Sequence, residues 1–151
     1  MPQSLANVII HLVFSTKDRA PVLGPAVLAS LHAYLATVVR EAGCDCPRVG
    51  GCADHVHLAI RLSQTESIAH LVEEIKTASS HWLKGRQLPE LAGFSWQRGY
   101  GVFSVGPSDL AALLAYVDCQ EEHHRTRTFQ EEYRAFLSKY GVEHDERYMW
   151  D

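Results

Sequence analysis

The sequence predicts an α+β domain in which the elements follow the order β-α-β-β-α-β and further helices come after them. Three observations support this prediction: a β-branched apolar run near the N-terminus, two short strand candidates close together, and two stretches with apolar residues at helical spacing. This order is the split β-α-β, or ferredoxin-like, arrangement, in which an antiparallel sheet of four strands carries two helices on one face. The other face would be open to a ligand, a partner or the third helix.

The first strand and helix have the clearest patterns. Residues 8–14 are almost entirely apolar and rich in β-branched side chains, which is typical of a central strand covered on both faces. We interpret His11 within it as a buried, hydrogen-bonded histidine. Apolar residues then recur at helical spacing over residues 27–38, between Pro25, which suits a first helical turn, and Gly43, which favours a helix end.

The middle of the chain predicts a hairpin, a second helix and a last strand. Residues 46–52 and 55–62 are strand candidates with too few residues between them for anything but a tight turn. A stripe of residues spaced three and four apart begins at Ile68 and predicts a helix that ends in basic residues near Arg86. Residues 94–105 read as a bent or interrupted strand, with Gly99 and Gly101 as kinks.

Two further helices complete the chain, one beginning at Ser108 and one over residues 129–140. We expect one domain, residues 1–151, with a core over about 5–125 and a C-terminal helical extension over about 126–151. No apolar run approaches the roughly 18 residues that cross a bilayer, and the N-terminus lacks a secretory signal. We therefore expect a cytoplasmic protein with no membrane partner.

The cysteines and the charges limit the possible functions. Four cysteines fit a cytoplasmic protein as free thiols, and a structural zinc site on Cys44, Cys46, Cys52 and His55 is the alternative, although its spacing is unusual. The net charge is -4. Residues 1–108 carry nine Lys or Arg against eight Asp or Glu, whereas residues 109–151 carry five against ten. A nucleic-acid surface is therefore expected mainly on the first two-thirds of the chain.

The densest group of chemically active side chains is Asp54-His55-Val56-His57. Side chains two apart on a strand point the same way, so His55 and His57 can reach one ion or phosphate together. The alternative is two buried histidines with ordinary hydrogen bonds, because short metal motifs also occur by chance. Asp54 would either orient a metal-bound imidazole or cap the turn.

A second group of polar side chains lies on the third helix. Tyr116 and Gln120 are four residues apart and share one helical face, and His123 falls on the side of Tyr116. A phenol, an amide and an imidazole thus follow the border between the buried and exposed faces. A purely structural tyrosine at a helix edge is also common, so this group alone does not define a function.

Three segments, in this order, carry a specific resemblance: Asp54-His55-Val56-His57-Leu58, Trp96-Gln97-Arg98-Gly99-Tyr100 and Tyr116-Val117-Asp118-Cys119-Gln120. Together they resemble the single-tyrosine HUH transposases of bacterial insertion sequences. Two later segments resemble the branch associated with repeated palindromic elements: Glu121-Glu122-His123-His124 and Thr128-Phe129-Gln130-Glu131-Glu132-Tyr133. The resemblance runs from about residue 8 to the C-terminus.

The resemblance implies a bacterial DNA transposase with a tyrosine nucleophile. Its two histidines and its glutamine, here His55, His57 and Gln120, would bind a divalent metal, Mg²⁺ or Mn²⁺, although these donors also suit Zn²⁺ or Ni²⁺. Tyr116 would attack the scissile phosphate and form a 5′-phosphotyrosine, which conserves the energy needed to rejoin a strand. His123 and the adjacent His124 are rival ligands or proton shuttles.

The resemblance also implies the partners. The substrate would be single-stranded DNA folded into a hairpin, and the protein would be a homodimer with shared active sites. We expect backbone contacts to DNA from five residues, each of which could instead be an ordinary solvated charge: Lys76, His81, Lys84, Arg86 and Arg98. Two other functions remain as alternatives, a non-catalytic DNA hairpin-binding protein and a metal-dependent phosphoesterase that uses water.

Overall fold

The computed structural model describes residues 2–151. Its four strands are β1 (Val8–Ser15), β2 (Asp45–Cys52), β3 (His55–Leu62) and β4 (Gly101–Val105). Its helices are α1 (Pro25–Glu41), α2 (Ile68–Gly85), α3 (Leu110–Asp118), the single-turn α4 (Gln120–His123) and α5 (Phe129–Lys139). Among these residues, no helix is long and apolar enough to cross a membrane.

The four strands form one antiparallel sheet in the order β2-β3-β1-β4. This order confirms the predicted split β-α-β fold, because β1 and β3 occupy the centre of the sheet and β2 and β4 form its edges. The β2–β3 hairpin turns at Ala53 and Asp54, and β1 pairs with β3 along its whole length, so that Ser15 lies opposite His55. The ends of these two central strands therefore meet where the histidine pair begins.

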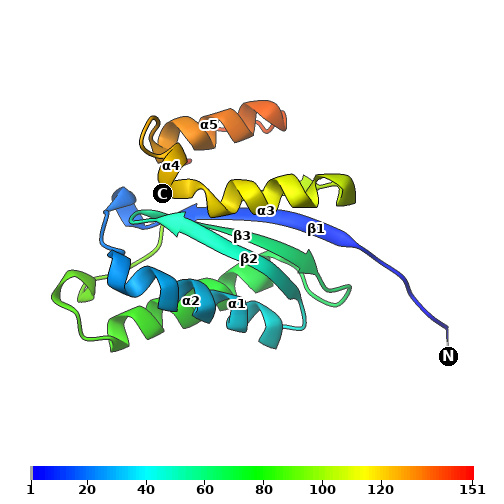
Figure 1. The fold of residues 1–151 in the computed structure, drawn as a ribbon, viewed down its shortest axis with the longest axis horizontal. Coiled ribbons are helices and arrows are strands. Elements are labelled where there is room, and N and C mark those ends of the chain that lie inside the picture. Colours follow the sequence, from blue (N-terminus) through cyan, green and yellow to red (C-terminus); the bar gives the residue numbers. More distant parts are fainter. Residues whose placement is uncertain (1) are drawn as a thin grey trace.

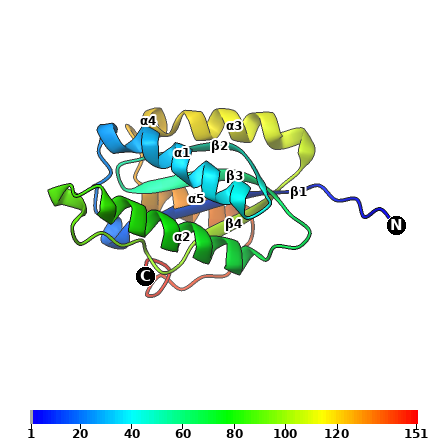
Figure 2. The same ribbon diagram turned by 90° about the horizontal axis from the view of Figure 1, so that it is seen from below.

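Helices α1 and α2 cover one face of the sheet, and α3, α4 and α5 cover the other (Figures 1 and 2). The main core lies on the α1–α2 face and contains alternate residues of the central strands, such as Leu12, Phe14 and Leu58. Two smaller apolar clusters lie on the other face, one around Phe103 and Phe129 and one under α3. The second face is therefore occupied by the chain's own C-terminal helices.

The segment before β4 is interrupted, as the sequence indicated. Only residues 101–105 pair as a strand, while Trp96 forms an isolated bridge with Thr16. The start of the third helix differs from expectation, because Pro107–Asp109 forms a 3-10 turn and no Ser108 side-chain cap is made. A serine cap needs the next backbone amides in α-helical geometry, which this tighter turn does not provide.

Candidate active site

The two histidines of β3 face the α3–α5 side of the sheet. Their neighbours Val56 and Leu58 alternate to the opposite face and join the main core. Both imidazoles are completely buried. The sequence-based expectation that His55 and His57 share one side of the sheet is therefore met, and the helices above them exclude water from the pair.

Each nitrogen of His55 has a polar partner. Nδ1 lies 2.7 Å from Asp54 Oδ1, and Nε2 lies 3.1 Å from Gln120 Oε1. The Asp54 carboxylate accepts a hydrogen bond from Nδ1–H, so the proton stays on Nδ1 and the lone pair of Nε2 is free to bind a metal. This contact is the one that the orienting role suggested for Asp54 requires.

His57 is held in the same way by residues from two other elements. Its Nδ1 lies 2.7 Å from Nε2 of His11 on β1, and its Nε2 lies 3.0 Å from Oε1 of Glu132 on α5. Burial lowers the pKa of His57 to about 4 and that of His11 to about 3. Both imidazoles are therefore neutral near pH 7, the form that binds a metal.

Four donor atoms from three elements converge on one point. The Nε2 atoms of His55 and His57 and a Glu132 carboxylate oxygen lie within 4.8 Å of one another, and Gln120 Oε1 adjoins His55 Nε2. The separations of 3.0 Å and 3.7 Å from Glu132 Oε1 to the two Nε2 atoms are close to the edges of a coordination polyhedron with bonds of about 2.1 Å. The residues present therefore fit a divalent metal.

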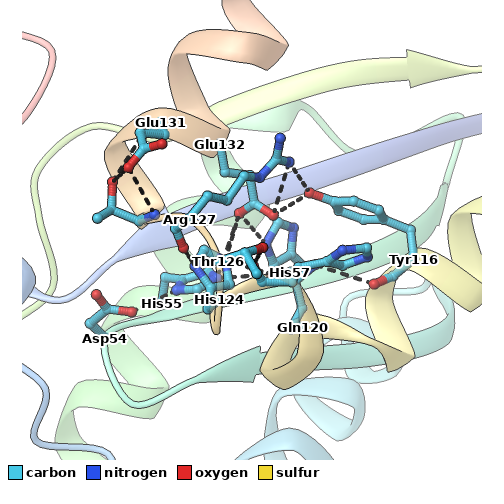
Figure 3. Close-up of polar contacts among 12 residues, drawn as sticks. Asp54, His55, His57, Tyr116, Gln120, His124, Thr126, Arg127, Glu131 and Glu132 are labelled. Carbon is cyan, nitrogen blue, oxygen red and sulfur yellow. Dashed lines mark hydrogen bonds and ion pairs between the residues drawn. The ribbon is translucent and has the colours of Figure 1, made fainter.

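Glu132 links the histidine pair to Tyr116. Its Oε1 faces the imidazoles, while its Oε2 accepts a short hydrogen bond from the Tyr116 hydroxyl (Figure 3). Its side chain is completely buried. Burial alone would raise the pKa of this carboxyl, but hydrogen bonds with His124, His57 and Tyr116 outweigh burial and hold the pKa well below its usual range. Glu132 is therefore an anion at the centre of the site.

The Tyr116 side chain is held on several sides. Arg127 Nη2 donates to the phenol oxygen at 3.0 Å, and the ring stacks on His123 with centroids 4.6 Å apart. Burial and the neighbouring Glu132 carboxylate raise the pKa of the phenol, and Arg127 offsets only part of this effect. A nearby positive charge is therefore needed to form the phenolate at neutral pH.

Two glycines allow the helices to approach the sheet closely enough to build this site. A Cβ on Gly50 of β2 would lie 2.8 Å from Val117 Cγ1 and would also meet the Val117 carbonyl oxygen on α3. A Cβ on Gly101 of β4 would lie 2.6 Å from a ring carbon of Tyr133 on α5. Tyr116 and Glu132, the residues directly before Val117 and Tyr133, depend on these contacts for their positions.

The residues predicted to contact DNA lie elsewhere. Lys76, His81, Lys84 and Arg86 are on or just after α2, on the opposite face of the sheet from Tyr116. Lys76 Nζ donates to the carbonyl oxygens of residues 97, 98 and 99 at 2.6–3.1 Å, so this ammonium group holds the loop before β4. Burial lowers its pKa to about 8. The exposed Arg98 lies in the same loop.

Sequence reasoning did not assign Glu132 and Arg127 to the site, and it treated His11 as structural. His11 is indeed buried and hydrogen-bonded, but its partner is His57 itself. His124, predicted as a rival ligand, lies 3.3 Å from Glu132 Oε1. One signal for Glu132 was present, because it interrupts the apolar stripe of α5 between Phe129 and Phe136, where an unpaired carboxylate would be costly.

The alternative zinc site on Cys44, Cys46, Cys52 and His55 is not assembled in the structure. Cys44 and Cys46 are buried in the main core on the α1–α2 side, away from the histidine pair. Burial raises the pKa of the Cys46 thiol to about 11, which disfavours the thiolate that zinc requires. Among the described residues, Cys52 forms a group with His55 and His124 that could hold an ion, and neither Cys44 nor Cys46 belongs to such a group.

Comparison with known proteins agrees with this fold and identifies the family. The family model described as "Transposase IS200 like" matches residues 4–120. The chain therefore belongs to the IS200-like transposase family, whose members act on DNA. The matched region contains the histidine pair, Tyr116 and Gln120, and it ends before α5 and Glu132.

Individual relatives are more distant. The ISDra2 transposase TnpA of Deinococcus radiodurans is 26% identical over 116 residues, which cover 74% of this chain and 83% of that protein. A crystal structure assigned to a transposase from Deinococcus radiodurans R1 has a TM-score of 0.64 at 23% identity, covering 80% of this chain and 95% of that chain. A REP-associated tyrosine transposase bound to a REP hairpin has a TM-score of 0.60 at 14% identity, and the match covers 82% of this chain and 72% of that chain.

Proposed function

We propose that this transposase cleaves and rejoins single-stranded hairpin DNA through a covalent bond between Tyr116 and a 5′-phosphate. The observation that carries the proposal is the carboxylate of Glu132, which contacts both the His57 imidazole and the Tyr116 hydroxyl. This contact supports the proposal because it joins the candidate nucleophile to the candidate metal centre within a single chain. The hairpin substrate is supported by the solved relative that is bound to a REP hairpin.

The chain's own residues account for each step. His55, His57, Gln120 and Glu132 would hold a divalent ion, Mg²⁺ or Mn²⁺, which would polarise the scissile phosphate and offset its charge. We propose that the hydrogen bond to Glu132 Oε2 holds the Tyr116 hydroxyl in place while the phenol oxygen attacks phosphorus and loses its proton to solvent. The bond from phosphorus to the 3′-oxygen then breaks, and that oxygen takes up a proton from water and leaves as a 3′-hydroxyl.

Rejoining follows the reverse path. A 3′-hydroxyl from another strand end attacks the phosphotyrosine, and Tyr116 recovers its proton as the phosphorus–phenol bond breaks. Arg127 lies 3.0 Å from the phenol oxygen and stabilises the negative charge that this oxygen carries when it leaves. The energy of the phosphodiester is kept throughout, so the proposed reaction needs no nucleotide cofactor.

We keep the homodimer as a proposal, in which two copies join along a sheet edge. One chain already contains Tyr116 beside its own histidine pair, with the Tyr116 and His57 ring centroids 5.8 Å apart. This placement supports a tyrosine that acts within its own chain. Light scattering would give the oligomeric state, and mixing Tyr116→Phe with His57→Ala protein would restore activity only if the tyrosine acts in the partner's site.

The test of the proposed function is a covalent protein–DNA band that survives denaturation. Labelled single-stranded hairpins from the DNA that flanks the gene are incubated with wild-type protein and Mn²⁺ or Mg²⁺. An adduct supports the proposal. Cleavage without an adduct would favour the water-dependent phosphoesterase, and hairpin binding without cleavage would favour the non-catalytic binding protein.

A further inference from the structure

A cavity of about 470 Å³ lies between α3 and α5 and ends at the Tyr116 side chain. Its walls are mostly apolar and aromatic, and include Ala112 and Leu113 of α3 and Phe136 of α5, with His11 as part of its lining. Tyr116, Arg127 and Glu132 line its inner end. The proposed reaction uses only this inner end and leaves the apolar remainder without a role.

The cavity has the properties of a site for a planar aromatic ligand. Pockets for small ligands combine apolar and aromatic walls with a few polar groups, and unstacked bases bind against aromatic side chains. Two exposed alanines, Ala112 and Ala135, border the cavity from the facing helices, so no large side chain fills the space between them. Lys139 lies on the lining and can attract a phosphate, while Asp109 supplies the opposite charge elsewhere on it.

The in-line geometry of phosphoryl transfer indicates which nucleotide this would be. The leaving 3′-oxygen departs on the side of phosphorus opposite to the attacking Tyr116 oxygen. The preceding nucleotide is therefore directed away from Tyr116. The nucleotide that keeps the 5′-phosphate stays bonded to Tyr116, and its base is the one within reach of a cavity that Tyr116 lines.

We propose that the cavity between α3 and α5 binds the base of the nucleotide whose 5′-phosphate Tyr116 attacks. This inference rests on the proposed function and adds a base-binding subsite to it. Stacking in the cavity would hold the scissile phosphate in register with Tyr116 before cleavage, and it would retain the DNA end while the covalent bond exists.

The test fills the cavity by substituting a lining residue that has no part in the proposed reaction. Ala112→Phe places a ring in the opening, and Ala111→Phe is the matched control, because Ala111 is also exposed on α3 but does not line this cavity. Affinity is measured by fluorescence anisotropy in a Tyr116→Phe background, so that no turnover intervenes. The probe is the hairpin strand that forms the adduct with wild-type protein, whose cleavage position is read from the product length.

We expect Ala112→Phe to weaken binding of this strand by roughly tenfold and Ala111→Phe to leave it unchanged. An abasic residue at the nucleotide 3′ to the cleaved bond should weaken binding to the unsubstituted cavity by a similar factor. Ala112→Phe should then cause no further loss, because the base that it excludes is already missing.

The results that would overturn the inference also show whether the proposed function fails with it. If the adduct forms with wild-type protein but Ala112→Phe and Ala111→Phe bind the strand equally, or if the abasic strand still responds to Ala112→Phe, the base-binding subsite is wrong and the proposed function stands. If wild-type protein forms no adduct with any flanking hairpin, the proposed function fails and this inference fails with it.

Discussion

The two faces of the central strands perform different tasks, although they are built from alternating residues of the same chain segments. On the α1–α2 face, Leu12, Val56 and Leu58 belong to a large apolar core. On the α3–α5 face, His11, His55 and His57 are equally buried, yet each makes a polar contact. One face stabilises the fold and the other holds a group of polar side chains.

This difference shows how a buried polar site can be tolerated. Burying an unpaired imidazole or carboxylate is costly, so each polar group on the α3–α5 face has a partner from another element. Glu132 is paired with His57 and Tyr116, and His55 is paired with Gln120 of α4. The site therefore depends on the chain's C-terminal helices, whereas the main apolar core is built by the sheet, α1, α2 and the loop residues Leu23, Leu91, Phe94 and Trp96.

Replacing His57 should have the largest effect on activity. His57→Ala removes a proposed metal donor and leaves the buried Glu132 without one of its partners. We expect DNA cleavage to fall by about a thousandfold or more, because the metal is worth several kcal/mol in such reactions. Isothermal titration should show a parallel loss of affinity for Mn²⁺. Unchanged cleavage would mean that His57 has no part in the reaction.

The neighbouring residue on the same strand should behave in the opposite way. Leu58 is completely buried on the α1–α2 face, so Leu58→Ala leaves a cavity in the main core. We expect the free energy of unfolding to fall by about 2–5 kcal/mol, with Mn²⁺ affinity unchanged in the folded protein. Denaturant titration measures the loss of stability, and titration with Mn²⁺ measures metal affinity in the same variant. If metal affinity fell as much as in His57→Ala, the two faces would not be independent.

Gly50→Ala should affect both properties to a smaller extent. The new methyl group would push α3 away from β2 at Val117, next to Tyr116. We expect a loss of about 1–3 kcal/mol in stability and roughly a hundredfold in cleavage rate, since small displacements of a nucleophile are costly. Gly24→Ala is the control, because no atom lies within 4 Å of its added Cβ. Equal rates for the two variants would contradict this account of how α3 is positioned.

Acidification should destabilise the metal-free protein through the α3–α5 face. The pKa values of His57, about 4, and His11, about 3, lie below the ordinary value of 6.5, so between these values the unfolded chain binds more protons than the native one. Stability therefore rises with pH in this interval and is lost as the pH falls, while His124, with a raised pKa, acts in the opposite sense.

We expect a net loss of about 2 kcal/mol in the free energy of unfolding between pH 7 and pH 5. Urea titrations at the two pH values, with a chelator present, would measure it. His57→Ala, which has one buried imidazole fewer, should lose less over the same interval. A flat profile for the wild-type protein would mean that these histidines take up protons over the same pH range in the native and unfolded states.

The parts of the site that could be predicted are those set by local periodicity. Alternation along a strand places His55 and His57 together. The expectation that Tyr116 and Gln120 share one continuous helix is wrong, because α3 ends at Asp118 and Gln120 begins α4, although Gln120 Nε2 still donates to the Tyr116 carbonyl oxygen at 3.2 Å. Glu132 could not be placed in this way, because its position depends on how α5 folds back over the sheet. That docking is a tertiary contact, made by Phe129, Tyr133 and Gly101, and no local pattern specifies it.

The same reasoning explains the basic residues of α2. Their place on a helix follows from the sequence pattern, but the face of the sheet that α2 covers relative to Tyr116 does not. Lys76 shows the difference, because its ammonium group is bound by three backbone carbonyls of the loop before β4. Contacts from His81, Lys84, Arg86 and Arg98 to DNA stay a prediction.

The most direct measurement is the covalent adduct formed by three proteins, wild type, Tyr116→Phe and Tyr148→Phe, with Mn²⁺ and the flanking hairpin strands. Tyr148 is 63% exposed near the C-terminus and is the matched control. We expect a denaturant-resistant protein–DNA band from wild type and Tyr148→Phe and none from Tyr116→Phe. A band of undiminished intensity from Tyr116→Phe would contradict the central claim that the tyrosine beside Glu132 is the nucleophile.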